Sequence, residues 1–270
     1  MTNNLSVVVI AKNEEEKVAV CLESLRWADE IIIADNGSSD KTIEIAKNFT
    51  SKVFRFEGLT FDEIRNKATE KTTNEWILYV DADERILASL KEEIKQLINS
   101  SKYSAYAISR RNIIFGEEVK YGPFFPDWVI RLVKKEAFEG WIGKVHEYLK
   151  FKGELGYTTN SMLHLTHRNV DQFILKTLDY SKIDSKLRFD TNHPKMTGWR
   201  FLRIFITETF NQGFRRQGFF GGTIGVIDSL LQTFSMLITY IRLWELQQKI
   251  PLKKKYENID QKLLENDFQL

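Results

Sequence analysis

Polar side chains follow three apolar runs in the first hundred residues, and their types are those that bind metal ions and nucleotides. The three clusters are Ala11-Lys12-Asn13-Glu14 after residues 5–10, Asp35-Asn36-Gly37-Ser38 after residues 30–34, and Asp81-Ala82-Asp83 after residues 76–80. Apolar, β-branched runs of this length predict strands that are buried in a parallel sheet. Ligands of such sheets bind outside the carboxyl ends of the strands, so we expect the three clusters to form one site.

Asp81 and Asp83 are separated by one residue, which places two carboxylates around a turn at a strand end. Such a pair can hold a divalent cation that bridges the two phosphates of a nucleoside diphosphate and neutralises the charge of the leaving group. Asp35 can accept a hydrogen bond from a pyrimidine N–H. Aspartate is also common in turns and at helix N-caps, but three polar strand ends together favour a nucleotide-diphosphate site. The chain contains neither GxGxxG nor GxxxxGK[ST], so Rossmann and P-loop binding lose their main support.

The elements that must position these side chains alternate between strand and helix. Strands are expected at residues 5–10, 30–34, 52–56 and 76–80, with helices at 61–70 and 87–98, which predicts βαβ units and a parallel sheet. From residue 103 the pattern changes to strands at 103–109 and 129–133 around the loop YGPFFPDW. We expect a catalytic domain at residues 1–168, with a nucleotide-sugar half at 1–100 and an acceptor half at 101–168, and a helical segment at 169–270.

Composition excludes several classes of protein. The 270 residues are 43% hydrophobic and 28% charged, which is typical of globular rather than disordered chains. Lysine and arginine number 39 against 37 acidic residues, so a nucleic-acid partner is not indicated. The single cysteine excludes a disulfide framework and a multi-cysteine metal cluster. The first residues lack the pattern of a signal peptide, so we expect a cytoplasmic location.

Several motifs, in order, resemble family 2 glycosyltransferases of the GT-A fold. They are LSVVVIAKNEEE, DNGSSDKT, IRNKA and WILYVDADERI, and the similarity continues through RRNIIFG, YGPFFPDWVIRLVKK and GKVHEYL. Within the family the chain is most similar to the lipopolysaccharide core β-glucosyltransferases. The resemblance implies an inverting transfer of a hexose from a UDP-linked donor to a lipid-linked or cell-envelope saccharide, assisted by Mg²⁺ or Mn²⁺.

The resemblance also assigns donor-binding roles. Ala11, Asn13 and Glu14 are expected to line the nucleotide pocket, and Asp35 to contact the uracil. Asn36 departs from the family pattern, in which a second aspartate or a serine is frequent; asparagine keeps an acceptor oxygen and loses the charge.

Arg65, Asp81 and Asp83 are expected on the phosphate side of the donor. The resemblance places Arg65 near the pyrophosphate, Asp81 on the ribose side, and Asp83 as a ligand of the divalent cation.

Three histidines are further candidates. His146 is interpreted as a third metal ligand, as a phosphate hydrogen-bond donor, or as an ordinary strand-end histidine. His164 and His167 have a spacing seen in some metal sites, but no third soft ligand lies near them in sequence. We therefore expect a structural or acceptor-side role for this pair.

An inverting transfer needs a general base opposite the leaving diphosphate. Asp127 follows the aromatic loop, where the family carries its acidic base, and we favour it; Glu147 is the second candidate. Arg110, Arg111 and Arg131 are interpreted either as a site for anionic acceptor groups or as salt-bridged surface residues.

The segment at 198–244 combines aromatic residues and arginines with few acids. Residues 223–240 are nearly apolar but are interrupted by Asp228 and Gln232, and charges near the middle of a membrane span are costly. We expect a pair of interfacial helices on the inner leaflet of the membrane, not a span. The alternatives are a packed helical subdomain and an oligomer interface.

Two further classes of function remain open from the sequence. A nucleotidyltransferase can share a related α/β core, but it carries a glycine-rich, basic loop after the first strand, where this chain has the acidic KNEEE. A non-catalytic sugar- or nucleotide-binding module on the same fold is disfavoured because Arg65, Asp81, Asp83 and a candidate base are all present.

Overall fold

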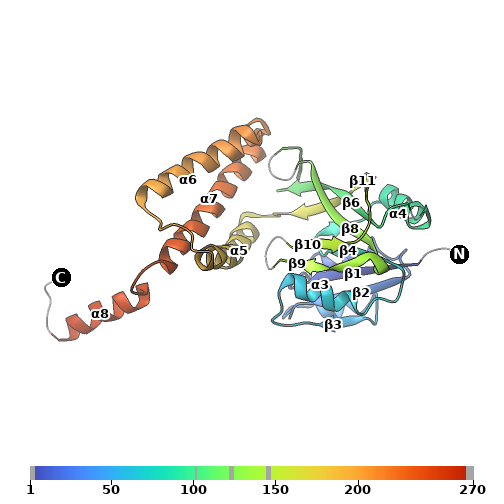
Figure 1. Cartoon of the computed structure of the whole chain (residues 1–270), viewed down its shortest axis with the longest axis horizontal. Helices are drawn as coiled ribbons and strands as arrows, with labels where there is room; N and C mark the ends of the chain where they lie inside the picture. Colours follow the sequence, from blue (N-terminus) through green and yellow to red (C-terminus); the bar gives the residue numbers. More distant parts are fainter. Residues whose placement is uncertain (1–3, 101, 122–124, 144–146, 266–270) are drawn as a thin grey trace. The chain divides into compact units, whose positions relative to one another are not determined.

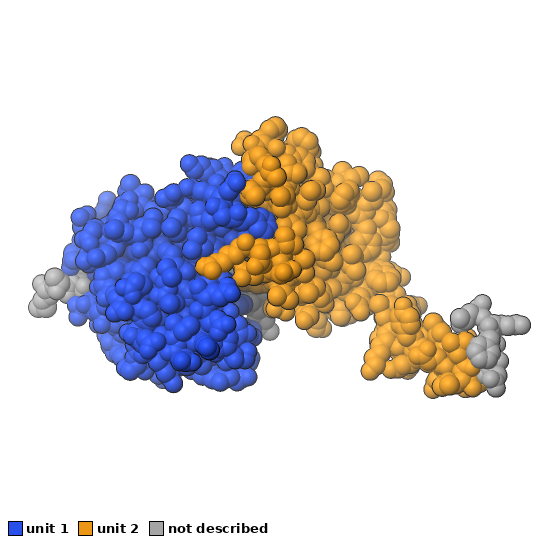
Figure 2. All heavy atoms as spheres, turned by 180° about the vertical axis from the view of Figure 1, so that it is seen from behind, with its two compact units in different colours: residues 1–167 blue, residues 168–270 orange. Residues whose placement is uncertain are grey.

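The computed structural model describes residues 4–100, 102–121, 125–143 and 147–265. The chain divides into two compact units, residues 1–167 and residues 168–270, coloured blue and orange in Figure 2. The first unit holds the sheet, and the second unit is helical in its described part (Figure 1).

Four parallel strands form the half of the sheet that carries the predicted site. They lie in the order β3 (Val53–Arg55), β2 (Glu30–Asp35), β1 (Leu5–Ala11) and β4 (Trp76–Asp81). The helices α1 (Val18–Glu23), α2 (Thr42–Ala46) and α3 (Phe61–Thr69) connect them, and α3 is labelled in Figure 1. In this register Ala11 lies opposite Asp35 and Ile10 opposite Asp81, so the three polar clusters begin at one edge of the sheet.

The other half of the sheet is mixed. It contains β8 (Asp127–Lys134), β6 (Ala105–Ile114), β11 (Leu155–Thr166) and the short β5 (Glu84–Arg85) in that order, and β7 (Glu117–Val119) pairs with β6. The strand β8 is antiparallel to both β4 and β6, whereas β11 is parallel to β6. Helix α4 (Ala88–Ser100) follows β5, and β9 (Phe138–Ile142) pairs with β10 (Tyr148–Phe151) in a separate small sheet.

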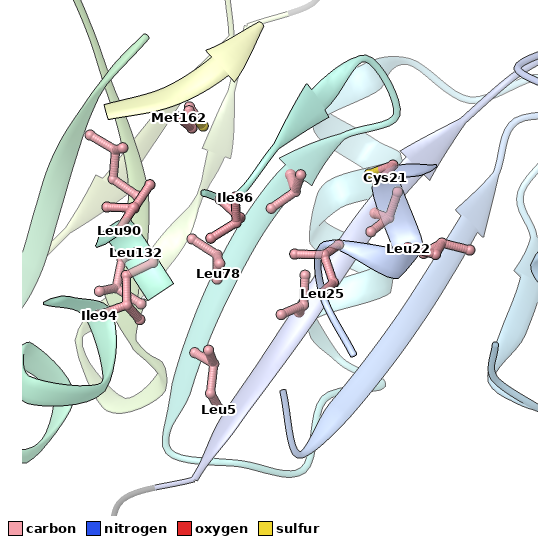
Figure 3. Close-up of a cluster of buried hydrophobic side chains, with 14 of the residues drawn as sticks. Leu5, Cys21, Leu22, Leu25, Leu78, Ile86, Leu90, Ile94, Leu132 and Met162 are labelled. Atoms are coloured by element: carbon pink, nitrogen blue, oxygen red, sulfur yellow. The ribbon is translucent and has the colours of Figure 1, made fainter. Parts of the chain in front are cut away.

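The hydrophobic core has two layers because alternate residues of β1 and β4 point to opposite faces of the sheet. Leu5 and Leu78 belong to one layer, which packs on α1 and α4 and includes the buried Cys21 (Figure 3). Burial raises the pKa of the Cys21 thiol, so this side chain is a core residue. Ile77 and Tyr79 belong to the other layer, which packs on α3.

The second unit consists of α5 (Val170–Asp190), α6 (Gly198–Phe210), α7 (Gly222–Leu246) and α8 (Leu252–Leu264). A π-helical turn (Asn211–Arg215) and a 3₁₀ turn (Gly218–Phe220) join α6 to α7. Met196, Ile204 and Leu243 form its small buried cluster. Of the helices described in the structure, α7 has both the length and the apolar composition that crossing a membrane requires, which by itself is weak evidence of a span.

The predicted fold class is confirmed: a largely parallel, twisted sheet is flanked by helices and followed by a helical extension. The sequence underestimates β6, which continues through Arg110, Arg111 and Asn112. Polar residues inside a strand weaken the apolar pattern from which its end is predicted. The spacing of Asn13 and Glu16 is typical of a capping box, but Asn13 lies in a loop with φ 54°, and the capping box lies at Thr60 and Glu63 of α3.

Candidate active site

The loops after β1 and β2 are joined by side-chain hydrogen bonds. The backbone N–H of Asn13 donates to Ser38 Oγ at 2.9 Å, and the Ser39 N–H donates to Asn13 Oδ1 at 2.8 Å. The Glu14 N–H donates to Thr42 Oγ1 at 2.7 Å. Asn13 and Glu14 therefore lie beside the second strand end, and their polar atoms shape the loops from which a nucleotide pocket would be built.

Asp35 ends β2 as a fully buried carboxylate. Its oxygens accept hydrogen bonds from the backbone N–H groups of Gly37 and Ser38 at 3.0 Å each. Gly37 has φ 78°, a left-handed conformation that favours glycine, and this bends the chain back over the carboxylate. The structure thus gives Asp35 a role in fixing the loop, and its contact with uracil stays a prediction.

Arg65 is held in place by α3, whose N-terminus is closed by the Thr60–Glu63 capping box. Its Nη2 lies 2.7 Å from Asp81 Oδ1 and 3.3 Å from Glu147 Oε1. Its guanidinium carbon lies 4.5 Å from the ring centroid of Trp141, a cation–π contact. Helix α3, the end of β4 and the residue before β10 therefore converge on one buried guanidinium.

Asp81 is neutralised by two arginines. Besides Arg65, Arg131 Nη2 of β8 contacts Asp81 Oδ2. Burial alone would raise the pKa of Asp81, but the two guanidinium groups outweigh it and lower the pKa to about 2. Asp81 is therefore an anchoring carboxylate whose oxygens are both engaged.

A buried network of charge continues from Asp81 into the acceptor half. Arg131 also contacts Glu84 Oε1 at 3.0 Å, and Arg110 Nη1 lies 3.4 Å from the same oxygen. Arg110 then binds Asp127 through two hydrogen bonds of 2.9 and 3.1 Å. Glu84 and Arg131 are fully or nearly buried, and the nearby carboxylates raise the pKa of Arg131. Charges at this depth are stable only when they are paired.

From the sequence alone the roles of Arg110, Arg111 and Arg131 stayed open, and Glu84 had no predicted role. Arg131 and Arg110 belong to the buried network, whereas Arg111 pairs with Glu118 at the surface. The spacing of Asp127 and Arg131 gives no reliable signal, because the pairing of β8 with β6 shifts register at Arg131, between Ile130 and Leu132, and such an irregularity breaks the alternation of faces.

A series of polar contacts links Asp83 to Asp127. His164 Nε2 of β11 is 3.5 Å from Asp83 Oδ2, and His164 Nδ1 is 2.6 Å from Asn112 Oδ1. The Asn112 amide donates to Asp127 Oδ2 at 2.9 Å. A carboxylate needs a donor, so this bond fixes the amide orientation and makes Asn112 Oδ1 the acceptor of the Nδ1–H. In the neutral imidazole the lone pair is then on Nε2, next to Asp83.

Asp83 and His164 suit a divalent cation that the protein and the substrate phosphates would bind together. No cluster of three or more acidic, histidine or cysteine side chains suited to a metal occurs among the described residues. One or two protein ligands are sufficient, however, where a cation is bound mainly through substrate phosphates. Asp83 follows the end of β4, as predicted, and His164, for which a structural or acceptor-side role was expected, lies beside it and could supply a second ligand. The tentative ligand His146 lies outside the described residues.

The two base candidates lie at different points of the network. Asp127 has three N–H donors on its carboxylate, from Arg110 and Asn112, and is linked to Asp83 through His164. Glu147 contacts Arg65 on the donor side.

Ala11 is buried and its carbonyl accepts the Asn36 N–H at 2.9 Å, which joins the first two strand ends.

Comparisons with known proteins show the family to which the chain belongs. Residues 6–219 match the glycosyl transferase family 2. An uncharacterized glycosyltransferase of Rickettsia typhi is 28% identical over 259 residues, which cover 91% of this chain and 88% of the relative. The lipopolysaccharide core biosynthesis glycosyltransferase LpsC of Rhizobium meliloti is 26% identical over 257 residues, 89% of this chain and 92% of that protein.

Solved structures of similar fold are more distant in sequence. S. aureus TarS 1-349 in complex with UDP-GlcNAc is 13% identical, covers 87% of this chain and 81% of that one, and has a TM-score of 0.46. Glucosyl-3-phosphoglycerate synthase from Mycobacterium tuberculosis in complex with Mn²⁺ and UDP-glucose is 21% identical, covers 40% of this chain and 44% of that one, and has a TM-score of 0.35.

Proposed function

Because this chain belongs to glycosyl transferase family 2 and is therefore an enzyme of sugar transfer, EC 2.4.-.-, we propose that it moves a hexose from a UDP-linked donor to a saccharide acceptor with inversion. The family decides against the nucleotidyltransferase and the non-catalytic module. The observation that carries the proposal is the placement of Asp83 and His164 beside the strand ends that carry Asn13 and Asp35.

The two aspartates of the DAD sequence have separate tasks in this proposal. Asp81 positions Arg65 and Arg131 through ion pairs, and its backbone N–H donates to Glu84 Oε2 at 2.9 Å across the turn after β4. Asp83, with His164, holds the cation at the diphosphate. A bound Mg²⁺ or Mn²⁺ supplies charge neutralisation on the departing nucleoside diphosphate. Arg65 adds a fixed positive charge on the same side.

Asp127 is the general base of the proposal. A carboxylate has about four lone-pair sites, and three are taken by Arg110 and Asn112, which orient the carboxylate and leave one to receive the proton of the acceptor hydroxyl. The path through Asn112 and His164 keeps Asp127 at a fixed distance from Asp83, as a single displacement requires for nucleophile and leaving group. Glu147 lies on the donor side through Arg65 and is the alternative base.

The proposed acceptor is a lipid-linked or cell-envelope saccharide, met at the cytoplasmic face of the inner membrane. The relative LpsC, which acts in lipopolysaccharide core biosynthesis, supports this acceptor class, and a β-glucosyltransferase of that group is the finer proposal. The second support is the exposed apolar surface of the helical unit described below.

The proposal is tested by a donor screen. UDP-glucose, UDP-galactose and UDP-GlcNAc are compared for thermal stabilisation and for release of UDP, each with Mn²⁺ and with EDTA. A donor present at about 100-fold its Kd stabilises the protein by about 2.7 kcal/mol, and turnover is expected only with the cation. Cation-independent turnover contradicts the metal assignment, and stabilisation by no nucleotide-sugar contradicts the proposal as a whole.

A further inference from the structure

The helical unit buries many small or polar side chains and exposes many large apolar ones. On α5 the buried positions at every fourth residue are Phe173, Thr177, Ser181 and Ser185, of which the last three are small and polar. On α7 they include the small residues Gly225 and Ser229. Soluble helices bury their large apolar side chains and expose the polar ones. Small residues at helix contacts let the helix backbones approach closely, and here they leave most large apolar side chains on the outside.

The large apolar side chains of α6 lie on its outer surface. They recur at helical spacing and are Trp199, Leu202, Phe205, Ile206 and Phe210. Trp199 is 69% exposed and Phe210 61% exposed.

Helix α7 adds a parallel stripe with Val226, Leu230, Phe234 and Ile241, all exposed. Contiguous exposed apolar surface of this extent marks an interaction site. Here it lies on two helices that pack against each other.

An apolar groove lies between the two stripes. It has a volume of about 500 Å³ and is lined by Phe201, Leu202, Phe205, Leu237 and Ile241. These lining side chains have no hydrogen-bonding group, so a polar ligand would lose its hydration without compensation there. A hydrocarbon chain has no such penalty.

Positively charged side chains beside the groove favour an anionic lipid headgroup. Arg200 and Arg203 lie on α6 itself, and Arg215 lies in the turn that follows. None of the three forms an ion pair within the described part of the chain, and Arg203 and Arg215 are exposed. Residues 168–270 contain 16 lysines and arginines against 11 acidic residues. An anionic lipid surface is the complementary partner.

The same structure argues against a membrane span by α7. Helix α5 packs on α7 and carries exposed charged side chains, including Asp179, Lys182 and Lys186. A span would place these charges in hydrocarbon. The one acid within the apolar stretch, Asp228, is turned inward, hydrogen-bonded to Gln232 at 3.2 Å, and does not interrupt the exposed stripe as the sequence had indicated.

We propose that the groove between α6 and α7 takes an acyl chain of an anionic bilayer lipid, while the two apolar stripes insert at the headgroup boundary and Arg203 and Arg215 contact lipid phosphates. Membrane binding through this site brings the catalytic unit to a lipid-linked acceptor, and in that use it rests on the proposed function. The binding itself does not depend on catalysis.

The test is flotation of the full chain with vesicles of phosphatidylcholine alone and of phosphatidylcholine with about one third phosphatidylglycerol. The wild type is expected to float with the anionic vesicles and to bind less at about 0.5 M than at about 0.05 M salt. Phe205→Asp, which places a charge in the groove, is expected to weaken binding at least tenfold. Leu175→Asp on α5, an apolar position outside the two stripes that is more exposed than Phe205, is the matched control and is expected to bind as the wild type does.

Two further measurements separate the possible outcomes. Quenching of tryptophan fluorescence by lipids brominated along the acyl chain is expected in the wild type and reduced in Trp199→Phe. Inorganic phosphate is expected neither to quench nor to compete, which distinguishes a lipid headgroup from a free phosphate. Release of UDP from soluble donor is expected to be equal in all the variants, so its loss in the wild type counts against the proposed function and not against the lipid site.

The inference is overturned by any of three results. The wild type floats with no vesicle at either salt concentration, or Leu175→Asp loses as much binding as Phe205→Asp. The third is that the chain elutes as a dimer that Phe205→Asp dissociates, which means that a second copy covers the groove.

Discussion

Asp81 and Asp83 are both aspartates, but different side chains surround them. Asp81 has an arginine on each oxygen and a pKa lowered to about 2. Asp83 faces the imidazole of His164. A carboxylate bound by two guanidinium groups has little capacity left for a cation, so Asp83 stays the predicted metal ligand of the two.

Replacing Asp83 tests this division. Asp83→Asn is expected to lower kcat at least about 10²-fold and to remove the response to Mn²⁺, because the variant loses the charge that holds the cation at the diphosphate. Steady-state turnover is measured across a Mn²⁺ titration, with the exposed Asp179→Asn as control. A variant that keeps the wild-type Mn²⁺ dependence excludes Asp83 as a ligand.

The choice of base is tested by a pair of variants. Asp127→Asn is expected to lower kcat by about 10²–10⁴-fold with unchanged donor KM, as is usual for loss of a general base. Glu147→Gln is expected to change donor KM more than kcat, because Glu147 contacts Arg65 on the donor side. The reverse pattern, an inactive Glu147→Gln and an active Asp127→Asn, assigns the base to Glu147.

At this scale the sequence predicts which strand ends meet but not how their charges pair. Asp81, Asp83 and Asp127 were found because each lies next to an apolar run or a marked loop. Glu84 and His164 were not assigned to the site, because their role depends on β5 and β11 pairing, where His164 lies opposite Glu84 across 80 residues of chain. Pairing between strands so distant in sequence leaves no local signal.

At the scale of elements, Glu30 joins three parts of the parallel sheet. It begins β2 and accepts hydrogen bonds from Ser6 of β1, from Lys52 before β3, and from Thr73 before β4 at 2.9 Å. Burial alone would raise the pKa of Glu30, but these donors outweigh it and lower the pKa from 4.5 to about 2. The ionised form is therefore favoured in the folded state.

The pH dependence of stability follows from this shift. A lowered pKa means that the stabilising contribution is complete above about pH 4.5 and is lost as the pH falls towards 2. Glu30→Gln is expected to lower the free energy of unfolding by about 2 kcal/mol at pH 7 and to show a smaller further loss between pH 5 and pH 2.5 than the wild type. Urea unfolding at several pH values measures both, with the exposed Glu23→Gln as control.

An equal loss of unfolding free energy between pH 5 and pH 2.5 in the wild type and in Glu30→Gln would show that Glu30 does not join the strands in solution.

The strands themselves were predictable because β1, β2 and β4 are short apolar runs between helices. The end of β6 was not, since Arg110 and Asn112 point towards the network and not towards a hydrophobic core.

At the scale of the whole molecule, the two units have cores of different size. The first has two apolar layers on the faces of the sheet, whereas the second buries Met196, Ile204 and Leu243 and leaves much of its apolar surface outside. Stability in water comes mainly from buried apolar area, so the helical unit is expected to unfold first in the absence of lipid.

Calorimetry of the full chain with core variants tests this difference. Leu78→Ala and Leu243→Ala each remove a fully buried leucine and are each expected to destabilise their own unit by about 2–5 kcal/mol. Leu78→Ala lowers only the later transition and Leu243→Ala only the earlier one. Anionic vesicles are expected to raise the earlier transition and to slow amide exchange in α6 and α7, because lipid covers their apolar stripes. A single transition that both variants shift, and that vesicles leave unchanged, contradicts the separate stabilities and removes the lipid from the account of how the second unit is held together.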